Sequence, residues 1–167
     1  MHNWLMRYKL WWLLLITVLL LSDQYSKQWA LTQLNYGQPQ AVFLGLNFSL
    51  SFNHGVAFGW FNQNSDWLQW GLLLLIAVII GGLLYGLLLK TKPGQTLQSF
   101  ALSLMIGGAI GNFVDRINQG YVIDFIDFYV NGWHWHTFNL ADSYICLGTA
   151  LMLYWLWFGH LSSVTKE

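Results

Sequence analysis

Four apolar stretches are each close to the length that an α-helix needs to cross a membrane, which limits what the 167-residue chain can fold into. Such a helix needs about 20 residues to cross about 30 Å of hydrocarbon. The stretches occupy residues 10–29, 67–89, 97–114 and 139–158. The first is continuously apolar only from Leu10 to Leu21, so it must continue through Asp23 and Lys27 to span. We therefore expect a mainly α-helical integral membrane protein, with four transmembrane helices in a single membrane-embedded domain (1–167).

The composition supports a membrane protein and excludes several other classes. Only 8% of the residues are charged, whereas a soluble domain usually carries about a quarter. The seven basic and seven acidic residues cancel, so no basic surface is expected to bind nucleic acid. Cys146 is the single cysteine, which excludes an intrachain disulfide and a thiolate metal site. The first stretch resembles a cleaved signal peptide, but no small-x-small cleavage site follows Leu21. We therefore expect that it is retained as the first transmembrane helix.

The distribution of charge predicts how the helices are oriented. Cytoplasmic loops of membrane proteins carry an excess of Lys and Arg. With four spans, both termini share a side with the loop between the second and third spans. That side carries most of the basic residues, namely Arg7, Lys9, Lys90, Lys92 and Lys166. All the aspartates lie at or beyond the opposite boundary, so we expect cytoplasmic termini and a polar site at the outer face.

The two outer segments, residues 30–66 and 115–138, contain strand patterns. Residues 46–53 alternate strictly between Leu or Phe and Asn or Ser, which predicts a strand with one apolar face. Residues 121–130 are rich in β-branched and aromatic side chains, and Asn131-Gly132 follows them as a hairpin signal. We therefore expect a small extracytoplasmic β-platform resting on the four helices.

Ionisable residues at the ends of the spans need an explanation because they are costly near hydrocarbon. Asp23 and Lys27 are four residues apart and share one face of a helix. They form either an ion pair at a helix end or the polar floor of a site. Asp115 and Arg116 end the third span, and they are either an interfacial anchor pair or part of a site in which Arg116 holds a carboxylate.

Two further acids lie where a carboxylate is conspicuous. Asp142 falls in the first turn of the fourth span and could be a simple helix cap, but Asn139 fills the cap position better. We therefore expect Asp142 to point sideways into the bundle. Asp124 lies in an apolar stretch, and Asp127 is three residues further on. On a strand these two point to opposite faces, so one is expected to face protein and the other water.

Other features predict structure rather than chemistry. His134 and His136 share a strand face but are expected at the surface, and no metal site or cofactor is expected. Cys146 has no histidine nearby in the sequence to activate it, so we expect it to be a core residue. Gly107 and Gly111 have the spacing that allows close helix approach, which we expect between spans three and four.

Acids gathered at one face suggest a specific chemistry. Two carboxyls in a pocket of low dielectric constant cannot both ionise cheaply, so they share one proton. Such a pair can activate a water and protonate a carbonyl oxygen in the same step, which is the chemistry of aspartic peptidases. A proton-coupled carrier or small channel is the alternative, because intramembrane acids also relay protons. A binder of lipidated peptides without catalysis is a third interpretation.

Five sequence blocks, in order along the chain, resemble the lipoprotein signal peptidase family (signal peptidase II), and the resemblance covers nearly the whole chain. They include an Asp-x-x-x-Lys block, an Asn-x-Gly block ending in Ala-Phe, and a Gly-Asn-x-x-Asp-Arg signature. The blocks lie at residues 22–27, 52–59, 107–116, 122–125 and 138–143. Val56 stands where the family usually has alanine, and His54 is a variable position.

The resemblance implies that Asp124 and Asp142 are a catalytic pair. It also implies supporting and substrate-binding residues, which are Asp23, Lys27, Asn53, Gly55, Gly108, Asn112, Asp115, Arg116, Asn139 and Ala141. The implied fold has four helices, a small β-cradle and an outer amphipathic segment over the site. The implied substrate is a prolipoprotein whose cysteine bears diacylglycerol, cut just before that cysteine in a bacterial cytoplasmic membrane. Membrane lipid is the other expected partner, and a monomer is expected. A rival assignment puts Asp115 in the place of Asp124.

Overall fold

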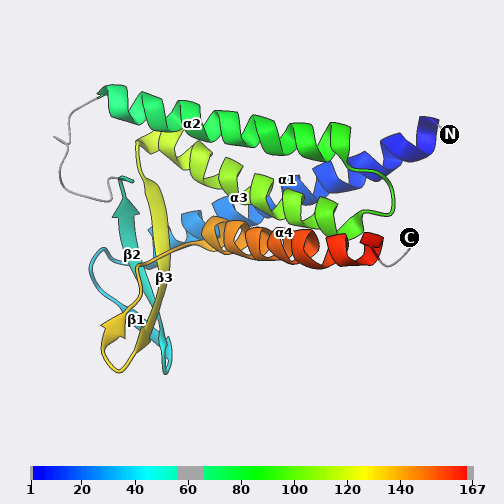
Figure 1. Cartoon of the computed structure of the whole chain (residues 1–167). Helices are drawn as coiled ribbons and strands as arrows, with labels where there is room; N and C mark the ends of the chain where they lie inside the picture. Colours follow the sequence, from blue (N-terminus) through cyan, green and yellow to red (C-terminus); the bar gives the residue numbers. More distant parts are fainter. Residues whose placement is uncertain (1, 56–65, 165–167) are drawn as a thin grey trace.

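The computed structural model describes residues 2–55 and 66–164, in which long helices run side by side and a small sheet lies at one end (Figure 1). The two ends of the chain lie at the other end of the bundle. The order along the chain is α1 (His2–Gln33), β1 (Gln40–Phe43), β2 (Leu46–Asn53), α2 (Asp66–Tyr85), the π-helix η1 (Gly86–Lys90), α3 (Thr96–Gln119), β3 (Val122–Val130), β4 (Trp133–His134) and α4 (Leu140–Val164).

The four spans expected from the sequence are confirmed. Helices α1, α2 with η1, α3 and α4 are each long and apolar enough to cross a membrane. Helix α3 is the central element, because half of its most apolar window is buried, against 11% for each of the other three. The outward faces of the other helices are covered with Leu, Val and Trp side chains, as expected for helices in contact with lipid.

Glycines let α3 pack closely against two neighbours rather than one. A Cβ atom at Gly107 would lie 2.8 Å from Leu19 of α1, and one at Gly111 would lie 2.5 Å from Asp23 of the same helix. The close approach to α4 comes from Gly108, where a Cβ would clash with the Ala141 carbonyl. The prediction that Gly107 and Gly111 join spans three and four was therefore wrong in its partner, because the two glycines mainly face α1.

The β-platform is a four-stranded antiparallel sheet in the order β1-β2-β3-β4. Strand β2 has the predicted bounds, and β3 starts one residue later than predicted. Asn131 and Gly132 both have positive φ, 49° and 79°, as a tight two-residue hairpin turn requires. Strand β1 was not predicted. The strict alternation of β2 is interrupted by a register shift between Phe48 and Ser51.

An apolar cluster fixes the sheet to the end of α1. It contains Ala30 and Leu34 of α1, Leu50 of β2, and Ile123 and Phe125 of β3, all buried. Burying a Leu, Ile or Phe side chain contributes about 1.5–3 kcal/mol each. The sheet is therefore held in one place relative to the helix ends, which is what a site shared between them needs.

Candidate active site

Four aspartates from four different elements meet where the helices join the sheet. Asp23 lies on α1, Asp115 on α3, Asp124 on β3 and Asp142 at the start of α4. The first three are buried, with at most 3% of each residue exposed, and Asp142 is half-buried. These acids fall into two groups that differ in what holds them.

The first group is a buried ion-pair network around Lys27. Its Nζ lies 2.8 Å from Asp23 Oδ2 and 2.8 Å from Asp115 Oδ2, so one ammonium group neutralises two carboxylates. Asp23 also accepts a hydrogen bond from the Ala141 backbone N–H. The predicted ion pair is thus present but lies inside the bundle. Because both side chains are covered, Asp23 and Lys27 support the site from within rather than presenting a surface to a substrate.

Gln24 belongs to this network and was missed in the sequence. Its Nε2 donates to Asp115 Oδ1 at 2.9 Å, to the Gly111 carbonyl at 3.2 Å and to Asp23 at 3.3 Å. It sits between the two acids that share Lys27. Its position beside Asp23 was the available signal, but an uncharged amide did not stand out among charged residues.

The second group consists of Asp124 and Asp142, and Asp142 also caps a helix. Asn139 Oδ1 accepts the Asp142 backbone N–H at 2.9 Å, and Asp142 Oδ2 accepts the Asn139 backbone N–H at 3.2 Å. This reciprocal arrangement is a capping box. The other oxygen, Oδ1, accepts from Asn112 Nδ2 at 2.7 Å. The two interpretations of Asp142 are therefore not alternatives, because each carboxylate oxygen serves one of them.

Asp124 is held by amides from two other elements. Its Oδ1 accepts from Asn139 Nδ2 at 2.7 Å, and its Oδ2 accepts from Asn53 Nδ2 at 3.1 Å. Burial raises the pKa of Asp124 to about 6, and the neighbouring charge of Asp142 adds to the rise, although both amide hydrogen bonds oppose it. Within the described residues, neither Asp124 nor Asp142 forms an ion pair.

Each of the three amides around these carboxyls has its orientation fixed by a donor. The Oδ1 atoms of Asn112, Asn139 and Asn53 accept from Lys27 Nζ, the Asp142 N–H and the Gly55 N–H, at 2.9 Å each. An amide whose oxygen is bound to a donor must present its NH₂ group on the other side. All three NH₂ groups therefore face a carboxylate oxygen.

Arg116 lies at the edge of this group, against Gly55. A Cβ atom at Gly55, which has a positive φ of 74°, would lie 2.6 Å from Arg116 Nη1. The charges of Asp124, Asp142 and Asp115 all act on the guanidinium. Within the described residues, however, it forms no ion pair. Of the two interpretations of Asp115 and Arg116, the anchor pair is therefore not the one observed, because Asp115 pairs with Lys27.

Asp127 lies in a separate contact on the sheet. It accepts from Asn47 Nδ2 at 2.9 Å and contacts His134 Nδ1 at 2.8 Å. The prediction that either Asp124 or Asp127 faces water was wrong, since both are buried. Strand β3 has protein on both faces at these positions, which a single strand pattern does not reveal. His134 is half-exposed and His136 exposed, as predicted.

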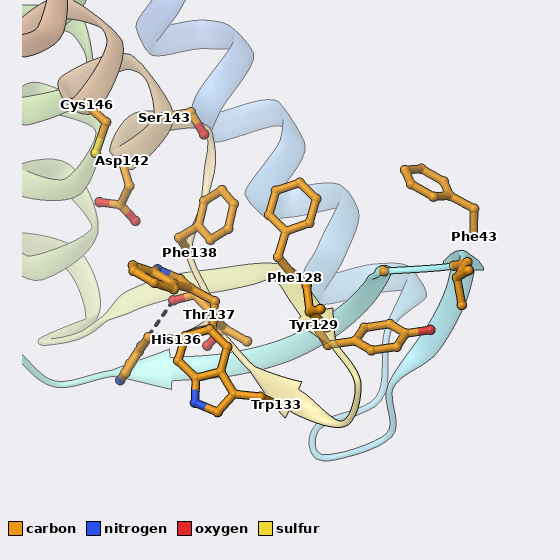
Figure 2. Close-up of a pocket in the computed structure, with 14 residues that line it drawn as sticks. Phe43, Phe128, Tyr129, Trp133, His136, Thr137, Phe138, Asp142, Ser143 and Cys146 are labelled. Carbon is orange, nitrogen blue, oxygen red and sulfur yellow. Dashed lines mark hydrogen bonds between the residues drawn. The ribbon is translucent and has the colours of Figure 1, made fainter.

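A largely apolar pocket of about 790 Å³ opens beside Asp142 (Figure 2). Asp142, Ser143 and Cys146 of α4 line one side, so Cys146 is exposed rather than a core residue. The opposite side is aromatic and comes from the hairpin and the segment after it, including Phe128, Trp133, Trp135 and Phe138. The half-exposed carboxylate thus borders a space suited to an apolar ligand.

The fold and site together define a polytopic membrane protein with a cluster of aspartates at one end of its helices. The chain belongs to the signal peptidase II family, since the family model described as "Signal peptidase (SPase) II" matches residues 15–158. It is therefore a peptidase. Val56, the position at which this sequence departs from the family pattern, lies outside the described residues.

Proteins of similar sequence or structure match this chain over most of its length. The lipoprotein signal peptidase of Serratia proteamaculans is 42% identical over 142 residues, covering 85% of this chain and 83% of that protein. The one from Coxiella burnetii is 40% identical over 149 residues, covering 89% and 91%. A bacterial membrane enzyme solved by the in meso method at 1.9 Å has a TM-score of 0.78 and 29% identity, covering 87% of this chain and 91% of that one. These names give the carrier or channel interpretation no support.

Proposed function

We propose that the protein is an aspartic endopeptidase that removes the signal peptide from diacylglyceryl-modified prolipoproteins, cutting just before the lipidated cysteine. The relatives named lipoprotein signal peptidase support the substrate class. The observation that carries the catalytic type is the contrast between the two groups of acids. Within the described residues, Asp124 and Asp142 are held by amides and form no ion pair, which favours a pair that holds one proton and exchanges it, as aspartic peptidase chemistry requires.

The surroundings of the two carboxyls favour different protonation states. Asp124 is buried and its pKa is raised to about 6, so it is the better proton holder. Asp142 lies at the N-terminus of α4, where the helix dipole and backbone N–H groups favour a negative charge. We therefore assign Asp124 as the acid and Asp142 as the base.

The reaction then follows from these states. Asp142 takes a proton from a water molecule, whose oxygen forms a bond to the scissile carbonyl carbon. The Asp124 proton passes to the carbonyl oxygen, which gives a neutral gem-diol. As the carbon–nitrogen bond breaks, Asp142 gives its proton to the leaving amine and Asp124 recovers one from the diol. The products are a signal peptide with a new carboxyl group and a lipoprotein with a free amino group on its cysteine.

The apolar pocket and the position of the site support a lipid-anchored substrate. The pocket borders Asp142 with aromatic walls, which suit an apolar part of the substrate next to the scissile bond. The site lies at the end of the bundle opposite the termini (Figure 1). With cytoplasmic termini, as the charge distribution predicts, it would be at the outer face of the bacterial cytoplasmic membrane. We propose that the enzyme acts there as a monomer and without a cofactor.

Processing of a lipidated precursor by the purified enzyme tests this function. The wild type is expected to release the signal peptide, and Asp142→Asn is expected to lose at least about 10³-fold in kcat while remaining folded and inserted. The Tyr8→Phe variant is a matched control, because it removes a polar contact at the far end of the bundle. Near-normal turnover by Asp142→Asn would end the assignment.

A further inference from the structure

The buried ammonium group of Lys27 contacts the amide that holds Asp142. Its Nζ lies 2.9 Å from Asn112 Oδ1, in addition to its contacts with Asp23 and Asp115. Only 2% of the Lys27 side chain is exposed, so it cannot reach a substrate in the pocket. Any influence of Lys27 on the reaction must therefore pass through its neighbours.

Asn112 is the junction through which that influence can pass. Its Oδ1 accepts from Lys27 and also from Asn139 Nδ2 at 3.2 Å, while its Nδ2 donates to Asp142 at 2.7 Å. Asn139 Nδ2 in turn contacts Asp124. If the Asn112 amide turned over, its NH₂ would meet the ammonium group and its oxygen would meet the Asp142 carboxylate. Both contacts would be repulsive.

Lys27 differs from the donors that fix the other two amides. Asn53 and Asn139 are oriented by backbone N–H groups, which a substitution does not remove. Asn112 is oriented by an ionic side chain, whose hydrogen bonds are stronger than those of neutral donors. The orientation of Asn112 is thus the one that a side-chain change can release.

We propose that Lys27 is a positioning residue of the proposed peptidase, which locks the Asn112 amide so that its NH₂ group holds Asp142 in place beside Asp124. This inference rests on the proposed function. It extends that function from the carboxyl pair to a third helix, because Lys27 lies on α1 whereas Asn112 and Asp142 lie on α3 and α4.

The same charge provides a readout that a purely structural role would not affect. The charged groups acting on Asp124 are Asp142 on α4, Lys27 on α1 and Arg116 on α3, and the Lys27 charge lowers the pKa of Asp124. Removing that charge is therefore expected to move the pH dependence of the folded enzyme to higher pH. Loss of folded protein alone would scale the activity at every pH without moving its midpoint.

The first experiment measures Lys27→Met on the full-length enzyme with a lipidated precursor. We expect kcat per folded molecule to fall about 10- to 100-fold, with KM within about twofold, because the site loses alignment but no substrate contact. Tyr8→Phe removes the 2.9 Å contact of α1 with Ser99 of α3 at the other end and is expected to leave both constants unchanged. Full activity of Lys27→Met, or an unmoved pH profile, would overturn the proposal.

A double-mutant cycle then tests whether Lys27 acts through Asn112. In an Asn112→Ala background, Lys27→Met is expected to cost less than about threefold, because the amide that it orients is already absent. Losses that multiply independently would show that Lys27 acts by another route and would refute the inference.

Lys27→Met leaves two buried carboxylates without their cation and could prevent folding, so a second set of variants keeps the proposal testable. If it does not accumulate, the triple change Lys27→Met/Asp23→Asn/Asp115→Asn is compared with Asp23→Asn/Asp115→Asn under the same criteria. A wild type that fails to cleave would refute the proposed function and this inference together. A wild type that cleaves while its Lys27 variants behave normally would refute only the inference.

Discussion

Two groups of aspartates lie side by side at the same end of the bundle, yet they are held in different ways. Asp23 and Asp115 share the ammonium group of Lys27 at 2.8 Å each. Asp124 and Asp142 are held by asparagine amides and backbone N–H groups. Asp124 is as deeply buried as Asp23 and Asp115, so burial alone does not distinguish the two groups.

The two groups of carboxylates differ in what protonation would cost each of them. Removing the negative charge of either carboxylate beside Lys27 would leave the buried ammonium group less compensated. Amide donors stabilise a carboxylate less, and a second carboxyl nearby opposes ionisation of the pair. The cation-held group is therefore suited to joining α1 to α3, and the amide-held group is suited to exchanging protons.

The strongest test of the difference between the two groups is to make the same substitution in each of them. We expect Asp124→Asn to lower kcat by about 10³-fold or more, since it removes the proposed acid. Asp115→Asn is expected to keep more than about a tenth of the activity per folded molecule. The measurement is the initial rate of precursor cleavage, normalised to folded enzyme. The reverse order would favour the rival assignment, in which Asp115 replaces Asp124.

The loss of stability is expected to be larger for a variant at Asp115 than for one at Asp124, which is the opposite of the order expected for activity. Asp115→Ala leaves the ammonium group of Lys27 with one carboxylate, which is expected to cost about 3 kcal/mol of unfolding free energy. Asp124→Asn removes a buried acid without leaving a cation unpaired and is expected to cost less than about 1 kcal/mol. Unfolding of both variants in the same detergent checks this. Equal losses would show that the two groups play the same structural role.

The pH dependence sharpens the comparison. The pKa of Asp124 is raised to about 6 from 3.8, so the folded state binds this proton more tightly than the unfolded state. Its contribution to stability is therefore fully present below about pH 4 and is lost as the pH rises through about 6. Activity that needs a protonated acid should fall over the upper part of this range.

Asn53 provides the variant for that test. Its NH₂ group favours the charged form of Asp124, so Asn53→Ala should move the falling limb up by about 0.5–1 pH unit. The control is Asn47→Ala on the same strand, whose amide donates to Asp127 instead. Rate profiles of the three proteins, measured with one precursor, give the answer. A limb that moves equally in both variants would disconnect it from Asp124.

The smallest effect is expected at Asp127, which belongs to neither group. Its partner His134 is half-exposed, so His134→Ala should cost less than about 1 kcal/mol and leave kcat unchanged. Tyr8→Phe, at the other end of the bundle, is the control. Thermal unfolding and cleavage rates check both. A large loss of activity at His134 would require a role for the hairpin in the reaction.

Much of the fold could be predicted because its signals are local. Helix length and apolarity located the spans, and the alternation of residues 46–53 gave β2 with the correct bounds. The positive φ values of Asn131 and Gly132 are what that dipeptide favours. Strand β1 was missed because its four residues are exposed and carry no pattern of their own. The pairing that makes it a strand is contributed by β2.

The residues of the candidate site could be named from the sequence, but their hydrogen-bond and ion-pair partners could not. Sequence blocks brought Asp124, Asn139 and Asp142 together, and the structure joins all three by hydrogen bonds. Which acid takes which partner depends on contacts across more than 80 residues, such as that between Lys27 and Asn112. For the same reason the sequence did not show that Asp115 pairs with Lys27 of α1.

The three oriented amides have a consequence for biosynthesis. Their anchors and targets come from α1, β2, the loop after it, α3, β3 and α4, so the set is complete only when the last helix has docked. A nascent chain that has inserted three helices has neither Asp142 nor the cap that orients Asn139. On the proposed function, a partly inserted chain lacks one carboxyl of the pair, and we expect it to hydrolyse no peptide until the last helix has docked.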